Sequence, residues 1–403
     1  MKIKKSILFL FFSVFISFLN CNRIKMVVKV PVADLRSEPE FPEYKKNGIN
    51  VNYPLLCPYV WDVGDKLQDT QLLLNDKLFF IDFVNEKNTW NNICDNDWIK
   101  VEVTEQKEFK DKLWSNLTGY VQFKDVCIVD KFLSNNLVTK KHLVPVYSLP
   151  FDDQSVEFSV SIGTKFRCKH VVSNEWLCVD YPIFGLCYIK RQDLNIILDE
   201  HIYGLDLVTR KNICLSAESF LDSPYSWGGR SSFDVNNKKQ QTGVDCSALV
   251  NLTYRANGFE VPRNAHDQFE FSEKIVSGKY LQPGDLIFFE SEKIKGRMSH
   301  VLMYLGKGEK GKKFVIEVTG FDPFKTRKIS VLDLLGKELN NIKAGEKLKG
   351  QVVYFGSFLN DLKKVLEMRT LFKVGLDDSD LRKEKINEEI NKKEKNNIGG
   401  EKK

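Results

Sequence analysis

The sequence predicts an α+β protein in which two small β-barrels precede a larger region of mixed helices and strands. From about residue 27 to 195, short strand-type runs alternate with turn residues, and the order of these runs occurs twice. From about residue 205 to 355, helix-type and strand-type patterns follow one another. With 403 residues, 42% of them hydrophobic, the chain is long enough and apolar enough for several cores.

The two β-rich segments are expected at residues 27–130 and 141–195. In the first, Trp98 is expected to fill the interior of a barrel, and Gly119 to allow a tight strand entry. The second repeats the same order of strand-type runs. A generic β-domain is the alternative for either copy alone, but a tandem repeat strengthens both.

The N-terminus has the pattern of a secretory signal over residues 1–21. Three lysines precede an apolar run at residues 7–19, which is too short for a comfortable membrane span. The run ends at Cys21, which resembles the lipidated cysteine of a lipoprotein signal, although Asn20 stands where a small residue is usual. An uncleaved anchor and a chance cysteine are the alternatives. We therefore expect an exported, cell-envelope protein that faces the periplasm or the cell wall.

The third region, residues 205–355, provides the candidate chemistry. Helices are expected at 213–221 and 246–257, and strands at 286–290, 300–305 and 314–318. The dense mixed charge of residues 377–403 indicates a solvated, partly disordered tail, to which we assign no function.

Cys246 and His300 are the candidate catalytic pair. Cys246 opens a helix, whose positive end favours a thiolate, and Asp245 occupies the N-cap position. His300 opens a strand in which it shares one face with Leu302 and Tyr304. A histidine in that position can face the helix start, hold a thiolate–imidazolium pair and later protonate a leaving amine.

The motifs at residues 225–229, 243–250 and 299–306 resemble the catalytic core of the NlpC/P60 family, papain-like cysteine peptidases that cut bacterial cell-wall peptides. The two β-rich segments are similar to the bacterial SH3 (SH3b) domains of wall peptidases. The resemblance implies a papain-like domain after two SH3-like barrels. Glu317 occupies the family position that usually holds a second histidine, and a carboxylate there would orient His300 and raise its pKa. An exposed strand residue is the alternative for Glu317.

The same resemblance implies a substrate site. Asp245, Ser247 and Asp69 match residues that hold the N-terminal ammonium of an L-alanyl peptide, and Tyr225 matches a tyrosine that reaches the active site. A solvated loop aspartate is the alternative for Asp69, and a core aromatic for Tyr225. His266 is expected to be a surface residue in a loop.

The implied reaction is hydrolysis of the γ-D-glutamyl–diamino acid bond of cell-wall muropeptides with a free N-terminal L-Ala. A broader wall endopeptidase, amidase or acyltransferase of the same fold is one alternative, and a non-catalytic SH3b wall-binding protein is another. We expect a monomer that acts on peptidoglycan-derived peptides, without a cofactor or metal. A net charge of +6 without an aromatic-interleaved basic patch argues against nucleic acid. The nine cysteines lack regular spacing, which favours free thiols over disulfides.

Overall fold

The computed structural model describes residues 23–39, 43–46, 49–52, 68–183, 185–197, 207–233 and 241–360, and all numbers of strands and helices refer to these residues. The expected signal with Cys21 and the charged tail at 377–403 lie outside them. Within the described part of the chain, no helix is both long and apolar enough to cross a membrane.

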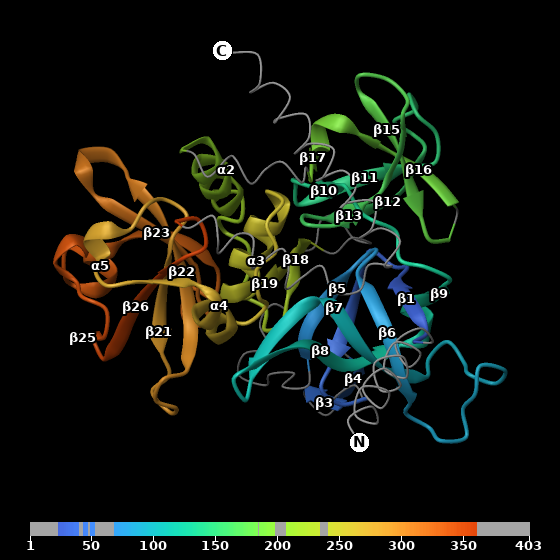
Figure 1. Ribbon diagram of the computed structural model, residues 1–403, viewed down its shortest axis with the longest axis horizontal. Coiled ribbons are helices and arrows are strands. Elements are labelled where there is room, and N and C mark those ends of the chain that lie inside the picture. The colour runs from blue at the N-terminus through green and yellow to red at the C-terminus, as the bar shows by residue number, and fades with distance from the viewer. Residues whose placement is uncertain are drawn as a thin grey trace, which may run out of the picture.

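The first region is a β-rich unit, shown in blue to teal in Figure 1. Seven strands form one sheet in the order β5-β2-β8-β7-β6-β1-β9, and β3 and β4 form a separate hairpin. Alternate residues point to one core, which includes Leu35, Val101 and Val121. The strands are β1 (Lys25–Val28), β2 (Val32–Arg36), β3 (Glu43–Lys46), β4 (Ile49–Asn52), β5 (Gln68–Leu73), β6 (Lys77–Phe83), β7 (Trp98–Lys110), β8 (Leu113–Gln122) and β9 (Val126–Val129).

Two predicted features of this region can be compared with the structure. Gly119 lies inside β8 rather than at a strand entry, and a side-chain carbon there would lie 2.8 Å from the carbonyl oxygen of Arg36, so the glycine allows β8 and β2 to approach closely. Trp98 is half-buried rather than enclosed. Among the described residues, β5 and β9 are the ends of the strand order and do not pair with each other. Since the two end strands do not pair, the sheet is open, and an SH3-like barrel stays a prediction.

The second region has its own core, around Val144, Phe166 and Ile189. A five-stranded sheet has the order β12-β11-β16-β15-β14, and a three-stranded sheet has the order β13-β10-β17. The strands are β10 (Leu137–Thr139), β11 (Leu143–Tyr147), β12 (Val156–Ser161), β13 (Lys165–Phe166), β14 (Cys168–Val171), β15 (Trp176–Tyr181), β16 (Gly185–Lys190) and β17 (Leu194–Ile196).

The third region packs helices on a large antiparallel sheet of order β20-β26-β21-β22-β23-β24, with β25 paired to β26. Val301 and Ile316 point to a core shared with the helices, and Leu302 and Val315 to a second core on the opposite face. The elements are α2 (Leu207–Glu218), β18 (Arg230–Phe233), β19 (Gln241–Val244), α3 (Cys246–Ala256), α4 (Ala265–Phe271), β20 (Glu273–Ile275), β21 (Leu286–Glu290), β22 (Met298–Lys307), β23 (Lys313–Val318), β24 (Thr326–Ser330), α5 (Val331–Leu335), β25 (Glu346–Leu348) and β26 (Gln351–Ser357).

Helices α2, α3 and α4 lie between this sheet and the two β-rich regions (Figure 1). Buried charges join the three regions. Arg255 of α3 contacts Asp76 at 2.5 Å and Glu105 at 2.8 Å, both in the first region. Lys165 of the second region pairs with Glu105 and with Glu260, which follows α3. Because a buried charge without a partner is strongly destabilising, this cluster fixes how the regions dock.

The predicted elements of the third region are largely confirmed. The helix that begins at Cys246 ends at Ala256, with Gly258 at φ +85° just beyond it. The predicted strands at 286–290, 300–305 and 314–318 correspond to β21, β22 and β23. The earlier helix is displaced: α2 spans Leu207–Glu218 rather than 213–221. The described cysteines are free thiols.

Candidate active site

Cys246 is the first residue of α3, as predicted. The Asp245 side chain accepts a hydrogen bond from the backbone N–H of Ala248 at 2.7 Å, which caps the helix. All residues of α3 after Cys246 are buried, so the helix is held by core packing on several sides. Cys246 itself is partly buried and packs against the edge of the core. The thiol therefore stands at the positive end of a rigid helix.

His300 of β22 lies between Cys246 and Glu317. Its Nε2 is 2.9 Å from Oε2 of Glu317, and the Cys246 thiol is the other group that acts on the imidazole. Burial would lower the pKa of His300, but the neighbouring Cys246 and Glu317 outweigh burial and raise the pKa to about 10. Both neighbours therefore favour the positively charged form of the imidazole.

Glu317 of β23 is almost completely buried, with 3% of its surface exposed. The prediction that it lies beside His300 is confirmed by this geometry, and the alternative of an exposed strand residue is wrong. Its second oxygen, Oε1, accepts hydrogen bonds from Nε and Nη2 of Arg327 at 2.9 and 2.7 Å. Burial would raise the pKa of Glu317, yet His300 and Arg327 hold the pKa below its usual range.

Sequence reasoning did not find Arg327. It lies directly opposite Glu317 in the β23–β24 pairing. Alternation of side chains along β24 was a possible signal, but the partner of Glu317 depends on the hairpin register, which the residues between the strands do not reveal.

Asp245 and Ser247 have partners within the protein. Arg263 forms a two-point ion pair with the Asp245 carboxylate, at 3.0 and 2.7 Å. The same guanidinium donates to Ser247 Oγ and to Thr70 Oγ1 of the first region. Gly228 donates its N–H to Asp245 at 3.0 Å. The charge of Asp245 is thus already balanced by Arg263. The sequence, from which Asp245 was predicted to bind an ammonium group, did not reveal this ion pair.

Tyr225 is buried beside the nucleophile. Its backbone forms a bridge with Val244, and burial raises the pKa of its hydroxyl, with the Cys246 and Asp245 charges acting in the same direction. Its ring fills the space above Gly320, where an added side-chain carbon would lie 3.1 Å from the ring. Tyr225 is therefore both a core aromatic and a wall of the site.

Asp69 lies on β5, at the border between the first region and the catalytic loop. A side-chain carbon at Gly228 would lie 3.2 Å from the backbone oxygen of Gln68 and 3.3 Å from the backbone of Asp69. Asp69 is half-buried, so a fully solvated loop residue is excluded. Burial and the nearby Glu108 raise the pKa of Asp69 to about 6, against the effect of Arg263 and Arg36.

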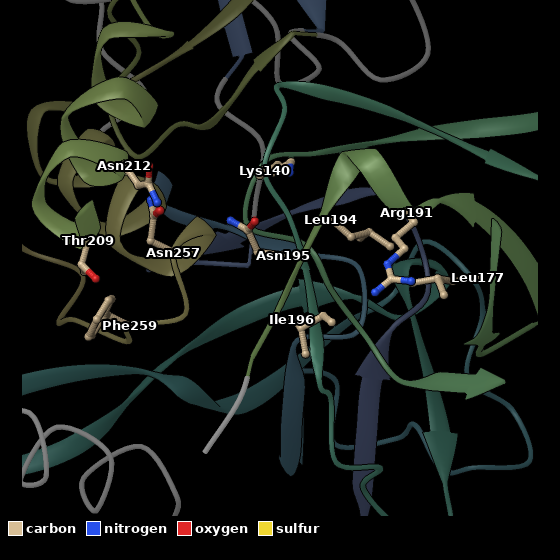
Figure 2. Close-up of a pocket in the computed structure, with 10 residues that line it drawn as sticks. All are labelled: Lys140, Leu177, Arg191, Leu194, Asn195, Ile196, Thr209, Asn212, Asn257 and Phe259. Atoms are coloured by element: carbon tan, nitrogen blue, oxygen red, sulfur yellow. The ribbon is translucent and has the colours of Figure 1, made fainter. Parts of the chain in front are cut away.

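Two other features lie outside this arrangement. His266 belongs to α4, so the expectation of a loop is wrong; its side chain is half-buried, and its Nδ1 accepts from the N–H of Met298 at 3.5 Å. A pocket of about 480 Å³ lies between the second region and helices α2 and α3, near Asn195 and Asn257 (Figure 2). Asn257 caps the far end of α3, about 16 Å from its start by helix geometry, so this pocket is separate from Cys246. In the described ranges, no group of three or more His, Cys, Asp or Glu residues is arranged to hold a metal.

Residues 222–318 match the model of the NlpC/P60 family, and this range includes Cys246, His300 and Glu317. The chain contains an NlpC/P60 domain. A crystal structure of an NlpC/P60 family protein from Bacillus cereus superimposes with a TM-score of 0.60 at 19% identity, over 83% of this chain and 99% of that one. The likeness supports a shared fold for the NlpC/P60 domain and the regions before it.

Curated relatives have related names. A gamma-D-glutamyl-L-lysine dipeptidyl-peptidase of Bacillus cereus is 24% identical over 62% of this chain and 68% of its own length. A protein of the same name from Bacillus subtilis is 38% identical over 32% of this chain and 38% of its own length. Dipeptidyl-peptidase 6 of Lysinibacillus sphaericus is 26% identical over 53% of this chain and 71% of its own length. With its NlpC/P60 domain, the chain is a cysteine-type peptidase of the hydrolase class.

Proposed function

We propose that the protein hydrolyses the γ-D-glutamyl–diamino acid bond of cell-wall muropeptides that carry a free N-terminal L-Ala. The observation that supports the reaction is the series Cys246–His300–Glu317: the thiol at the start of a buried helix acts on the imidazole, and the imidazole Nε2 is 2.9 Å from Oε2 of Glu317. Relatives named for cleavage of γ-D-glutamyl bonds support the substrate class.

Each residue of the series has a role in the proposed mechanism. The Cys246 thiolate attacks the γ-carbonyl carbon, and we assign the stabilisation of the oxyanion to the backbone N–H of Cys246. His300 gives its proton to the leaving amine of the diamino acid, which leaves an acyl-thioester on Cys246. His300 then takes a proton from water, whose attack on the thioester releases L-Ala-γ-D-Glu and restores the thiolate–imidazolium pair. Glu317 orients the imidazole and stabilises its charged form.

The first region supplies the proposed amino-end recognition. Asp69 lies on β5, and its backbone is in tight contact with Gly228 of the catalytic loop, so we assign its carboxylate to the substrate ammonium. Tyr225 contributes a wall of the site. Because Arg263 already balances Asp245, we assign Asp245 and Ser247 mainly to holding the site together, with substrate contact through their remaining hydrogen-bonding capacity.

The surrounding chain fits an envelope protein. We propose SH3b domains at 27–130 and 141–195, a catalytic domain at 205–355, and a signal at 1–21 with lipidation of Cys21. Relatives named as peptidoglycan endopeptidases of bacteria are consistent with a role outside the cytoplasm.

One observation favours a second candidate, a broader peptidoglycan endopeptidase. The Asp245–Arg263 ion pair already balances the Asp245 charge that an ammonium would need, which argues against strict amino-end selection.

The deciding experiment incubates the purified protein with a free-amine muropeptide, with its N-acetylated form and with intact sacculi, and follows products by mass spectrometry. Release of L-Ala-γ-D-Glu from the free-amine peptide alone supports the proposal. Equal cleavage of the acetylated peptide or of sacculi favours the broader enzyme. Equal product from Cys246→Ala, or none from the wild type, rejects the proposal.

A further inference from the structure

Three neighbouring strands contribute one side chain each to a continuous line of charges. His300 comes from β22, Glu317 from β23 and Arg327 from the edge strand β24. The two oxygens of Glu317 are divided between these partners: Oε2 faces the imidazole, and Oε1 accepts both Arg327 hydrogen bonds. Each oxygen of this buried carboxylate therefore has a defined partner.

A buried glutamate beside a histidine has two competing states. With its charge retained, it stabilises the imidazolium. If it takes up a proton from solution, or from the imidazole itself, the stabilising charge is lost. Burial favours the neutral acid, because a carboxylate is poorly solvated in the protein interior. A second cation on the far oxygen opposes this tendency without competing for the oxygen that faces His300.

We propose that Arg327 is a positioning residue that keeps Glu317 anionic and directs its Oε2 at the His300 imidazole. The inference rests on the proposed roles of Cys246 and His300. Arg327 makes no contact with the thiol, so it acts through Glu317.

The other charged groups near β23 are engaged elsewhere. Lys325, two residues before Arg327 in the chain, pairs with Asp222 at 2.6 Å. Asp333 of α5, which packs on β23, is hydrogen-bonded to Ser330. Cys246 of α3 acts on the imidazole of His300. Arg327 is therefore the cation that acts directly on Glu317 besides the histidine.

The test measures the rate of Cys246 alkylation by iodoacetamide against pH, in the full-length protein. Mass spectrometry of the peptide that contains Cys246 separates it from other thiols such as the exposed Cys94. Arg327→Gln is expected to raise the acid-side midpoint of the profile by about one pH unit, because loss of the cation makes Glu317 easier to protonate and so weakens the thiolate–imidazolium pair. We take the lower end of the effect of a nearby opposite charge, since Arg327 is one-third exposed. Lys328→Gln is the matched control, since Lys328 pairs with Glu218 at the surface.

A merely structural role is separated by a double-variant cycle. If Arg327 acts through Glu317, Arg327→Gln produces no additional shift in a Glu317→Gln background. Arg327→Lys, which keeps the charge, is expected to stay close to the wild type. An unchanged midpoint in Arg327→Gln, or an equal shift in the Glu317→Gln background, overturns the proposal. If the single variant does not fold, comparing Glu317→Gln with the double variant, which leaves no unpaired charge, still distinguishes the two roles.

This assay needs no substrate, so its result is independent of the muropeptide experiment. Lack of muropeptide cleavage would reject the proposed substrate and leave the role of Arg327 standing. An ordinary wild-type midpoint near ~8.5 would instead reject the thiolate–imidazolium pair itself, and with it the role of Arg327.

Discussion

Glu317→Gln tests how far the carboxylate controls the catalytic histidine. The substitution keeps the shape of the side chain and removes its charge. Its amide oxygen can still accept from Arg327, so the amide N–H₂ then faces Nε2 of His300. Since two donors cannot bond each other, this arrangement favours the neutral imidazole with Nε2 as acceptor. Charge and hydrogen-bond geometry therefore act in the same direction, toward a lower His300 pKa.

The magnitude follows from the interaction that is lost. A hydrogen bond to a charged group contributes about 1.5–3 kcal/mol, which corresponds to roughly one to two pKa units. The wild-type His300 pKa is raised to about 10. We therefore expect the alkaline limb of kcat/KM to lie near pH 10 in the wild type and to move down to about 8–9 in Glu317→Gln. The same loss predicts a decrease of about 10- to 100-fold in kcat/KM at neutral pH.

The assay is the initial rate of muropeptide cleavage across pH, with thermal melting at each pH to confirm that the protein stays folded. Glu218→Gln is the control, because it removes a surface carboxylate paired with Lys328 and should leave both limbs in place. An alkaline limb at the same pH in Glu317→Gln and wild type would refute the role of this carboxylate in setting the histidine charge.

Three further predictions concern the substrate site and the docking of the regions. Asp69→Asn is expected to raise KM about tenfold with little change in kcat. In the wild type, KM should rise as pH falls through about 6, because Asp69 becomes protonated, and the variant should lack this rise. Equal KM values for variant and wild type would contradict the ammonium site. Asp76→Asn, which leaves the buried Arg255 without its closest partner, should lower the free energy of unfolding by about 3–5 kcal/mol in urea titrations, against less than about 1 kcal/mol for the exposed Asp153→Asn. Burial lowers the pKa of His142 to about 4, so between pH 4 and about 6.5 the unfolded chain binds a proton that the folded protein does not. The free energy of unfolding should therefore decrease by up to about 1.4 kcal/mol for each pH unit of acidification in this window. The same dependence of the unfolding free energy on pH in His142→Gln would refute this contribution.

The sequence was sufficient for the local parts of the site. Asp245 is a typical N-cap residue before the amphipathic segment that begins at Cys246, and the continuous apolar run after His300 indicates its strand. The position of Glu317 followed from a family resemblance, and its contact with His300 agrees with that expectation. Each of these inferences needed only residues close together in the chain, or one pair of adjacent strands.

The partners that balance charge could not be predicted, because they come from distant segments. Arg263 meets Thr70 of the first region, and Arg255 meets Asp76, so both contacts depend on how the regions dock. Arg327 is closer in sequence to Glu317, but its pairing depends on a hairpin register set by the connecting loop. From the sequence alone, charged residues that become buried between regions cannot be distinguished from ordinary surface charges.

The central claim is that Cys246 carries the acyl group during peptide cleavage. The most direct measurement is mass spectrometry of the protein quenched in acid during turnover of a free-amine muropeptide, followed by peptide mapping. We predict a mass increase equal to L-Ala-γ-D-Glu minus water, located on the peptide that contains Cys246, and its absence in Cys246→Ala. Turnover that persists in Cys246→Ala, or an acyl group on another cysteine, would contradict the account.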